Sequence, residues 1–226
     1  SNGKTTTKEL ISSVLSRRYN THSTFGNLNN HIGVPLTLLQ MDESTEIGVV
    51  EMGANHIGEI AALCEIASPT HGYITNFGKA HLEGFGSGSG VIKGKSELYN
   101  YLKVHDGLIF ANKDDTIQLK QIGSYKNIYT FSNYSRSSDL QLSKSLNQSF
   151  LRLEYDGFSI QSQLIGSYNF SNLAASILIA RFFDVKNQII KKGIESYSPE
   201  NNRSQIIKKG SNTFILDAYN ANPSSM

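Results

Sequence analysis

The sequence has little cysteine: Cys64 is the only one among its 226 residues. A disulfide within the chain is therefore excluded, and no CxxC or Cys/His spacing typical of a structural zinc site occurs. These absences exclude a small disulfide-stapled scaffold and a zinc-dependent fold. They are typical of a protein of the reducing cytoplasm, which is the location we expect.

Long apolar runs and a charge excess of one sign are also missing. No apolar run approaches the roughly 18 residues that a membrane-spanning helix needs, and the first residues are polar, unlike a secretory signal. Lys and Arg number 21 against 19 Asp and Glu, and the basic residues are scattered. The composition therefore favours neither nucleic acid nor a membrane as a partner. The length and a hydrophobic content of 38% allow one large folded domain.

The first half of the chain alternates between patterns typical of strands and of helices. Apolar residues recur at helical spacing in positions 10, 11, 14 and 15, just after a short polar and glycine-containing start. Apolar runs bounded by turn residues follow at 47–50, 73–75 and 108–111, and helical patterns lie between them at 58–67 and 91–102. This alternation predicts an α/β fold with a doubly wound, mostly parallel sheet and helices on both faces.

The second half predicts a small antiparallel subsheet. Residues 151–155 and 158–164 are rich in β-forming residues and are joined by Asp156-Gly157, a strong hairpin signal. Helical patterns return at 169–183 and 186–197, and a second hairpin is predicted over residues 205–217. The serine-rich stretch 132–149 is predicted to be a loop.

The first five residues resemble a phosphate-binding loop. Gly3-Lys4-Thr5 matches the end of the P-loop pattern G-x-x-x-x-G-K-S/T, in which backbone N–H groups surround phosphate oxygens, the lysine contacts the β and γ phosphates and the hydroxyl contacts Mg²⁺. The alternative is that these three residues form an ordinary polar helix cap with no phosphate-binding role. A P-loop normally follows a buried strand, so we expect the first strand and the start of the loop to belong to a longer protein.

Polar residues follow two of the predicted strands. Glu51 closes the run 47–50, and Asn76 closes the run 73–75, with His81 in the loop beyond it. Open α/β sheets bind ligands at the carboxyl ends of their strands, where a Mg²⁺-binding carboxylate is expected. Solvent-exposed strand ends and a surface histidine are the plainer interpretations. Lys95, on the predicted helix beyond a glycine-rich stretch, would by itself be a solvated surface charge.

Taken together, these segments resemble one enzyme family. The phrases, in order, are SNGKTTTKEL, NLNNHIGVPLTLL, VVEMGANHIGEI, ITNFGKAHLEGFGS, KGKSELY, GSYNFSNLAASI and DAYNANPSSM. Their order and spacing resemble the central ATP-binding domain of the Mur ligases from the first residue to the last. EMGANHIGEI and YNANP are most similar to the branch that adds D-alanyl-D-alanine.

The resemblance implies an activity, cofactors and partners. It implies ATP and Mg²⁺, and a ligase that phosphorylates the terminal carboxylate of UDP-N-acetylmuramoyl-tripeptide to an acyl phosphate, which the amine of D-alanyl-D-alanine then attacks. Residues 1–216 would be the central domain, and 217–226 the start of a linker to a C-terminal domain. N- and C-terminal domains of the parent chain would be partners. Another amino-acid ligase of the same family and a non-catalytic nucleotide-binding fragment are the alternatives.

The resemblance also implies a role for individual residues at the phosphates and metals. The nucleotide would lie against Ser1, Asn2, Gly3, Lys4, Thr5 and Thr6. Thr5 and Glu51 would bind one Mg²⁺ and His81 would help to place a second, with Lys4, Glu51, His81 and Lys95 as the catalytic set. Lys95 matches a lysine that is carbamylated in several branches, and carbamylation would turn this cation into an anion able to bind metal.

Further residues are implied at the edges of the site. Asn169 and Asn172 match family asparagines near the adenine. Arg203 matches an arginine that approaches the phosphates, and Asp217 matches an acid that contacts the ribose. Tyr168 stands where many relatives have histidine, so the resemblance does not define how that edge of the nucleotide pocket is formed. Three asparagines could contact the muramoyl-peptide substrate, with a simple turn function as the alternative: Asn27, Asn29 and Asn30.

Overall fold

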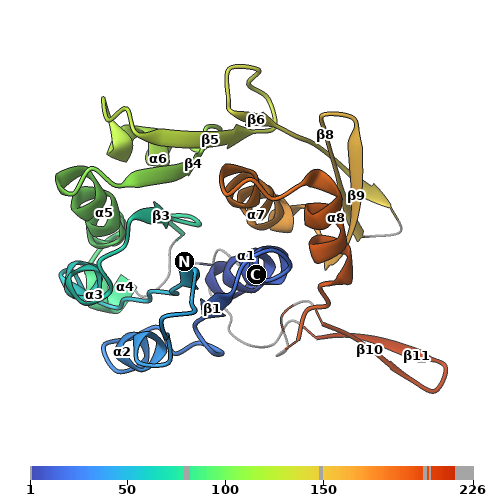
Figure 1. Cartoon of the computed structure of the whole chain (residues 1–226), viewed down its shortest axis with the longest axis horizontal. Helices are drawn as coiled ribbons and strands as arrows, with labels where there is room; N and C mark the ends of the chain where they lie inside the picture. The colour runs from blue at the N-terminus through green and yellow to red at the C-terminus, as the bar shows by residue number, and fades with distance from the viewer. Residues whose placement is uncertain (1, 79–81, 148–149, 201–202, 204, 217–226) are drawn as a thin grey trace.

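The largest sheet within the described residues is parallel and lies in the upper part of the view in Figure 1. The computed structural model describes residues 2–78, 82–147, 150–200, 203 and 205–216. Four strands pair in chain order and all run parallel: β3 (His71–Tyr73), β4 (Leu108–Asn112), β5 (Ile128–Ser132) and β6 (Leu140–Gln141). A second parallel pair is formed by β1 (Thr21–Ser23) and β2 (Ile47–Val49). The predicted mostly parallel α/β sheet is therefore confirmed.

Helices cover both faces of the sheet, as predicted. On β4, Ile109 and Ala111 belong to a core cluster with Tyr99 and Leu102 of α5 (Gly88–Val104). The intervening Phe110 belongs instead to the main core with α7 (Phe170–Phe182). Because successive side chains of a strand point to opposite faces, α5 and α7 pack on opposite sides of β4.

Helix α1 (Lys4–Leu15) is held in the main core by the apolar positions that its sequence pattern indicated. Leu10, Val14 and Leu15 are at most 1% exposed, and α1 packs against α7 and α8 (Asn187–Ser196). Gly193 of α8 allows this close packing, since a Cβ there would lie 2.8 Å from Cγ2 of Val14. The remaining helices are α2 (Gly33–Leu38), α3 (Glu59–Ala67), α4 (Leu82–Phe85) and α6 (Thr116–Ile122).

The predicted antiparallel subsheet is present beside α7 and α8. It contains β7 (Ser143–Asn147), β8 (Phe150–Tyr155) and β9 (Phe158–Ile165). Asp156 and Gly157 form the predicted turn, with φ of 46° and 77°. A short 3-10 helix, η1 (Ser167–Asn169), leads into α7. The second predicted hairpin is β10 (Gln205–Lys209) with β11 (Asn212–Leu216), which extends away from the main body (Figure 1).

The prediction of a loop over residues 132–149 holds for residues 133–139, which are turns and bends, and is wrong for residues 140–141 and 143–147, which are strands. Strand β6 pairs with β5, and β7 pairs with β8, so much of this stretch is extended and hydrogen-bonded. Leu140 and Leu142 are only 2% and 1% exposed. The serine-rich composition hid these strands because strand formation depends on burial and on neighbouring strands more than on local propensity.

The two parallel groups of strands are separated by a cavity of about 590 Å³. Residues of β2, including Ile47 and Val49, line one side, and His71 and Tyr73 of β3 line the other. Within the described residues, β2 pairs only with β1 and β3 only with β4. In the same part of the chain, no helix has the length and apolar character needed to cross a membrane.

Candidate functional site

The loop before α1 is held tightly between two other segments. Gly3 adopts φ +81°, and a Cβ on it would lie 2.4 Å from Oδ1 of Asn172. On the other side, the carbonyl of Asn2 accepts hydrogen bonds from Asn76 Nδ2 at 2.7 Å and from Thr75 Oγ1 at 3.0 Å. The backbone at Gly3 is therefore fixed at the carboxyl end of β3, where only a glycine fits.

The first turn of α1 has the features of a helix start that can bind an anion. Among the described residues no side chain caps Gly3 at the start of this turn, and the helix dipole adds partial positive charge there. Burial lowers the pKa of Lys4, and the charge of Arg203 lowers it further, whereas Glu51 opposes this change. Arg203 is therefore close enough to affect the charge of Lys4, and its contact with a phosphate stays a prediction. Phosphate groups commonly bind at such a helix start.

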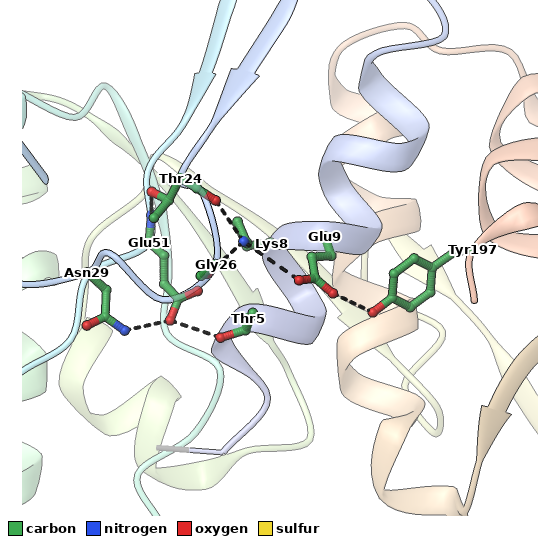
Figure 2. A network of polar contacts seen from close by, with 8 residues as sticks. All are labelled: Thr5, Lys8, Glu9, Thr24, Gly26, Asn29, Glu51 and Tyr197. Atoms are coloured by element: carbon green, nitrogen blue, oxygen red, sulfur yellow. Dashed lines mark hydrogen bonds and ion pairs between the residues drawn. The ribbon is translucent and has the colours of Figure 1, made fainter. Parts of the chain in front are cut away.

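Glu51 lies directly beyond β2, as predicted, and is 5% exposed. Its Oε1 accepts hydrogen bonds from Thr5 Oγ1 at 3.2 Å and Asn29 Nδ2 at 2.7 Å (Figure 2). Its Oε2 is buried and has no hydrogen-bond partner within the described residues. A buried carboxylate oxygen without a donor is costly unless a cation binds it, and Mg²⁺ prefers oxygen ligands, so the Thr5 and Glu51 pair fits a magnesium ion.

Lys95 lies on the same side of the molecule as Lys4 and Glu51, and all three line the cavity between the strand groups. Its Nζ donates to the carbonyl of Asn76 at 3.1 Å. Burial lowers the pKa of Lys95 to about 8, and the nearby charge of Lys4 contributes. Lys95 is therefore not the solvated surface charge that is usual for a helical lysine.

Asn169 and Asn172 support the phosphate-binding loop from the side of α7. Both are buried, and Asn172 Nδ2 donates to Asn169 Oδ1 at 2.8 Å while Thr7 Oγ1 donates to Asn172 Oδ1 at 3.1 Å. Thr6 is buried in the first turn of α1. The contact of the two asparagines with an adenine stays a prediction. Ser1, His81 and Asp217 lie outside the described residues, and among the described ones no three His, Cys, Asp or Glu side chains gather as a metal cluster would require.

The three asparagines predicted to contact substrate occupy different environments. Asn30 Oδ1 accepts from the backbone N–H groups of Ile32 and Gly33, which is the turn function left as an alternative. Asn29 bonds to Glu51, and the carbonyl of Asn27 accepts from the Asn29 N–H at 2.7 Å. A substrate contact by any of them stays a prediction.

Lys8 is a feature of the site that the sequence prediction missed. It is 6% exposed, and its Nζ donates to the carbonyls of Thr24 at 2.7 Å and Gly26 at 3.0 Å (Figure 2). Lys8 follows Lys4 by four residues, so the two lie on one face of α1. The four-residue spacing from Lys4 could have indicated that Lys8 lies in the site. Sequence reasoning missed it because a lysine in a polar run is usually assigned to the surface.

A family model described as the Mur ligase middle domain matches residues 1–180. The chain belongs to the Mur ligase family, whose members are ATP-dependent ligases. The P-loop α/β fold and the mixed sheets agree with this assignment.

Relatives with known names cover the whole chain. The UDP-N-acetylmuramoyl-tripeptide--D-alanyl-D-alanine ligases of Bacillus subtilis (strain 168) and Escherichia coli (strain K12) are 36% and 33% identical to it. The alignments include 100% of this chain but only 50% and 52% of those relatives. The chain thus spans about half the length of the curated relatives it matches.

Solved structures give the same result. A crystal structure of MurF from Acinetobacter baumannii has a TM-score of 0.89 at 33% identity and matches 100% of this chain and 50% of its own length. A MurF ligase from Thermotoga maritima, in complex with ADP, has a TM-score of 0.86 at 28% identity. The match includes 100% of this chain and 53% of the Thermotoga chain.

Proposed function

We propose that this chain is the central ATP-binding domain of a ligase that joins D-alanyl-D-alanine to UDP-N-acetylmuramoyl-tripeptide in the cytoplasm. The observation that carries the proposal is the position of Glu51, which bonds to Thr5 of the phosphate-binding loop and keeps one buried oxygen without a donor. The names of relatives at 36% and 33% identity supply the substrates.

The residues present fit ATP and Mg²⁺. When bound, ATP supplies the phosphoryl group that activates the substrate carboxylate, and Mg²⁺ neutralises charge on the phosphates. The N–H groups at the start of α1 and the ammonium of Lys4 would hold phosphate oxygens, and Arg203 would add positive charge at the same place. Thr5 and the unsatisfied oxygen of Glu51 would hold the cation, because the oxygen atoms of both side chains already lie together.

The other implied residues belong to the same proposal. His81 and a carbamylated Lys95 would hold a second metal ion, Asp217 would bind the ribose and Ser1 would complete the phosphate-binding loop. Carbamylation requires a neutral amine: the nitrogen attacks CO₂, a C–N bond forms and one proton is released. Burial of Lys95 makes that neutral form more accessible.

The parent protein would hold the two substrates with its other domains. Residues 1–216 form the central domain in this proposal, residues 217–226 begin the linker to a C-terminal domain, and an N-terminal domain binds the UDP-sugar. Bringing a carboxylate, a triphosphate and an amine together is a large part of the catalysis, since orientation alone can lower the barrier by about 7–11 kcal/mol.

The test is substrate selectivity of the parent ligase. Phosphate release is measured with ATP, Mg²⁺ and UDP-N-acetylmuramoyl-tripeptide, adding D-alanyl-D-alanine or single amino acids in turn. We expect turnover with the dipeptide and a product whose mass is increased by the dipeptide less one water. Turnover with a single amino acid instead would assign the chain to another ligase of the family. No turnover with any amine would favour a non-catalytic nucleotide-binding domain.

A further inference from the structure

The buried ammonium group of Lys8 lies close to the proposed magnesium site, on the first helix of the chain. Lys8 is 6% exposed, and its Nζ donates to two backbone carbonyls and lies 3.9 Å from Oε1 of Glu9. Glu9 is itself held by Tyr197, whose hydroxyl donates to Glu9 Oε2 at 2.7 Å (Figure 2). Burial of a lysine is costly, and a side chain such as methionine would fill similar space without that cost. The presence of a buried lysine here, rather than an apolar residue, is therefore best explained by its hydrogen bonds to the two backbone carbonyls.

Those carbonyls belong to the segment that follows β1. Thr24 and Gly26 both accept from Lys8, and Gly26 has φ +53°, so the chain turns sharply there. Thr24 is 1% exposed and its Oγ1 accepts from the backbone N–H of Glu51 at 2.9 Å. One buried residue thus connects the ammonium of Lys8 to the backbone of the acid.

The same segment brings a second donor to Glu51. Asn29 Nδ2 donates to Glu51 Oε1 at 2.7 Å, and the carbonyl of Asn29 accepts from the N–H of Gly53 at 2.7 Å. A Cβ on Gly53 would lie 2.7 Å from Asn29 Oδ1, so the two segments are in close contact. Asn29 and Thr5 both occupy Oε1, which leaves Oε2 as the carboxylate oxygen without a donor.

We propose that Lys8 is a positioning residue for the metal site: by holding the carbonyls of Thr24 and Gly26 it fixes residues 24–29, so that Asn29 orients the carboxylate of Glu51. The inference rests on the proposed function, since it concerns the acid that would bind Mg²⁺. Groups that orient a metal-binding side chain commonly change metal affinity by about 10–100-fold when they are removed.

The test compares metal binding in variants of the parent ligase. Lys8→Met removes the charge and keeps the volume, Asn29→Ala removes the bond to Glu51, and Lys120→Met on α6 is the control for an exposed lysine. Mn²⁺ binding is measured by electron paramagnetic resonance with ADP present, and amide exchange at Gly53 is measured without metal. Lys8→Gln replaces Lys8→Met if the latter does not fold.

We expect Lys8→Met and Asn29→Ala each to raise the Mn²⁺ concentration for half-saturation about 10-fold or more, while Lys120→Met leaves it unchanged. Because Lys8 acts through Asn29, the double variant should show no larger shift than the larger single one. Amide exchange at Gly53 should be faster in Lys8→Met.

Unchanged Mn²⁺ binding in Lys8→Met, or a double variant whose shift is the product of the two single shifts, would overturn the inference. The proposed function is tested separately by Glu51→Gln in the same assay. If Glu51→Gln weakens Mn²⁺ binding and Lys8→Met does not, only the inference fails. If Glu51→Gln binds Mn²⁺ normally, the proposed metal site itself is wrong.

Discussion

At the scale of single residues, the two oxygens of the Glu51 carboxylate have different surroundings. Oε1 accepts from Thr5 and Asn29, whereas Oε2 is buried without a donor among the described residues. This asymmetry makes Glu51→Gln an informative substitution, because glutamine can keep the acceptor at one position and places an amide nitrogen at the other.

We expect Glu51→Gln in the parent ligase to lower kcat by about 100-fold or more, since removal of a group that stabilises charge in the transition state typically costs this much. The stability of the fold should change little. Phosphate release at saturating ATP gives the measurement, and Glu43→Gln, at an exposed position, is the control. A normal rate for Glu51→Gln would mean that the chain kept the fold and uses another group for the metal.

Gly3 allows a similarly direct test of the phosphate-binding loop. We expect Gly3→Ala to weaken ADP binding strongly, because its Cβ would lie 2.4 Å from Oδ1 of Asn172 and φ is +81°. Gly58→Ala is the matched control: φ is +93°, but no atom lies within 4 Å of its Cβ. That variant should lose only about 1–2 kcal/mol of unfolding free energy through backbone strain. Equal ADP affinities for the two variants, by calorimetry, would argue against a tightly packed loop.

Lys95 leads to a spectroscopic prediction. With a pKa of about 8, roughly a tenth of the amine is neutral near pH 7, far more than for an ordinary lysine. We expect the parent ligase in ¹³C-labelled bicarbonate to show a carbamate resonance that is absent from Lys95→Gln and present in Lys93→Gln, whose lysine is exposed on the same helix. The resonance should weaken as the pH falls, because protonation removes the reactive amine. Its persistence in Lys95→Gln would place the carbamate elsewhere.

At the scale of helices and strands, the sequence predicted elements whose own residues carry the pattern. Helix α1 was predicted from its buried apolar positions, and the β8–β9 hairpin from Asp156-Gly157, because both signals are local. The strand predicted at 73–75 lies two residues earlier, at His71–Tyr73, since its limits are set by pairing with β4. Strands β1 and β5 and helices α2 and α6 were not predicted, and they are short elements.

For the candidate site, the sequence indicated which side chains lie near one another, whereas their roles stay predictions. Lys4, Thr5 and Glu51 follow from a loop motif and a strand end, and the structure brings them together with Lys95. The contacts of Lys8 and Asn29 join segments separated by 16 to 22 residues. Such contacts depend on the assembled fold, so the sequence pattern could not show them.

Helix α3 offers a test of packing in a single element. Cys64 is fully buried on α3, and burial raises the pKa of its thiol to about 12. We expect no alkylation of Cys64 by iodoacetamide at pH 8 in the native parent ligase, because the thiolate is scarce and the sulfur is enclosed. Modification should begin only as urea unfolds the protein, measured by the mass of the peptide that contains Cys64. Rapid labelling under native conditions would show that α3 does not pack as described.

At the scale of the whole molecule, the cavity between β2 and β3 separates the two groups of parallel strands. It lies between two strands that both run in parallel sheets, each paired on one side only within the described residues, and apolar side chains such as Ile47, Val49 and Ile74 line it. Open backbone edges and apolar surface of this kind are stabilised by an added extended segment. A P-loop is typically preceded by a strand of this kind, and we predict that an added extended segment pairs in this cavity.

This arrangement leads to a prediction about the chain on its own. We expect the 226 residues alone to show little or no ligase activity and to melt at least about 5 °C below the same chain extended upstream through the strand before the loop. An extension with proline at the centre of that strand is the control, because proline cannot donate the hydrogen bond that a central strand needs. It should melt like the unextended chain. If both extensions raise the melting temperature equally, strand pairing in the cavity is not the cause of the stabilisation. Full turnover by the 226 residues would show that the other domains are not needed to position the substrates.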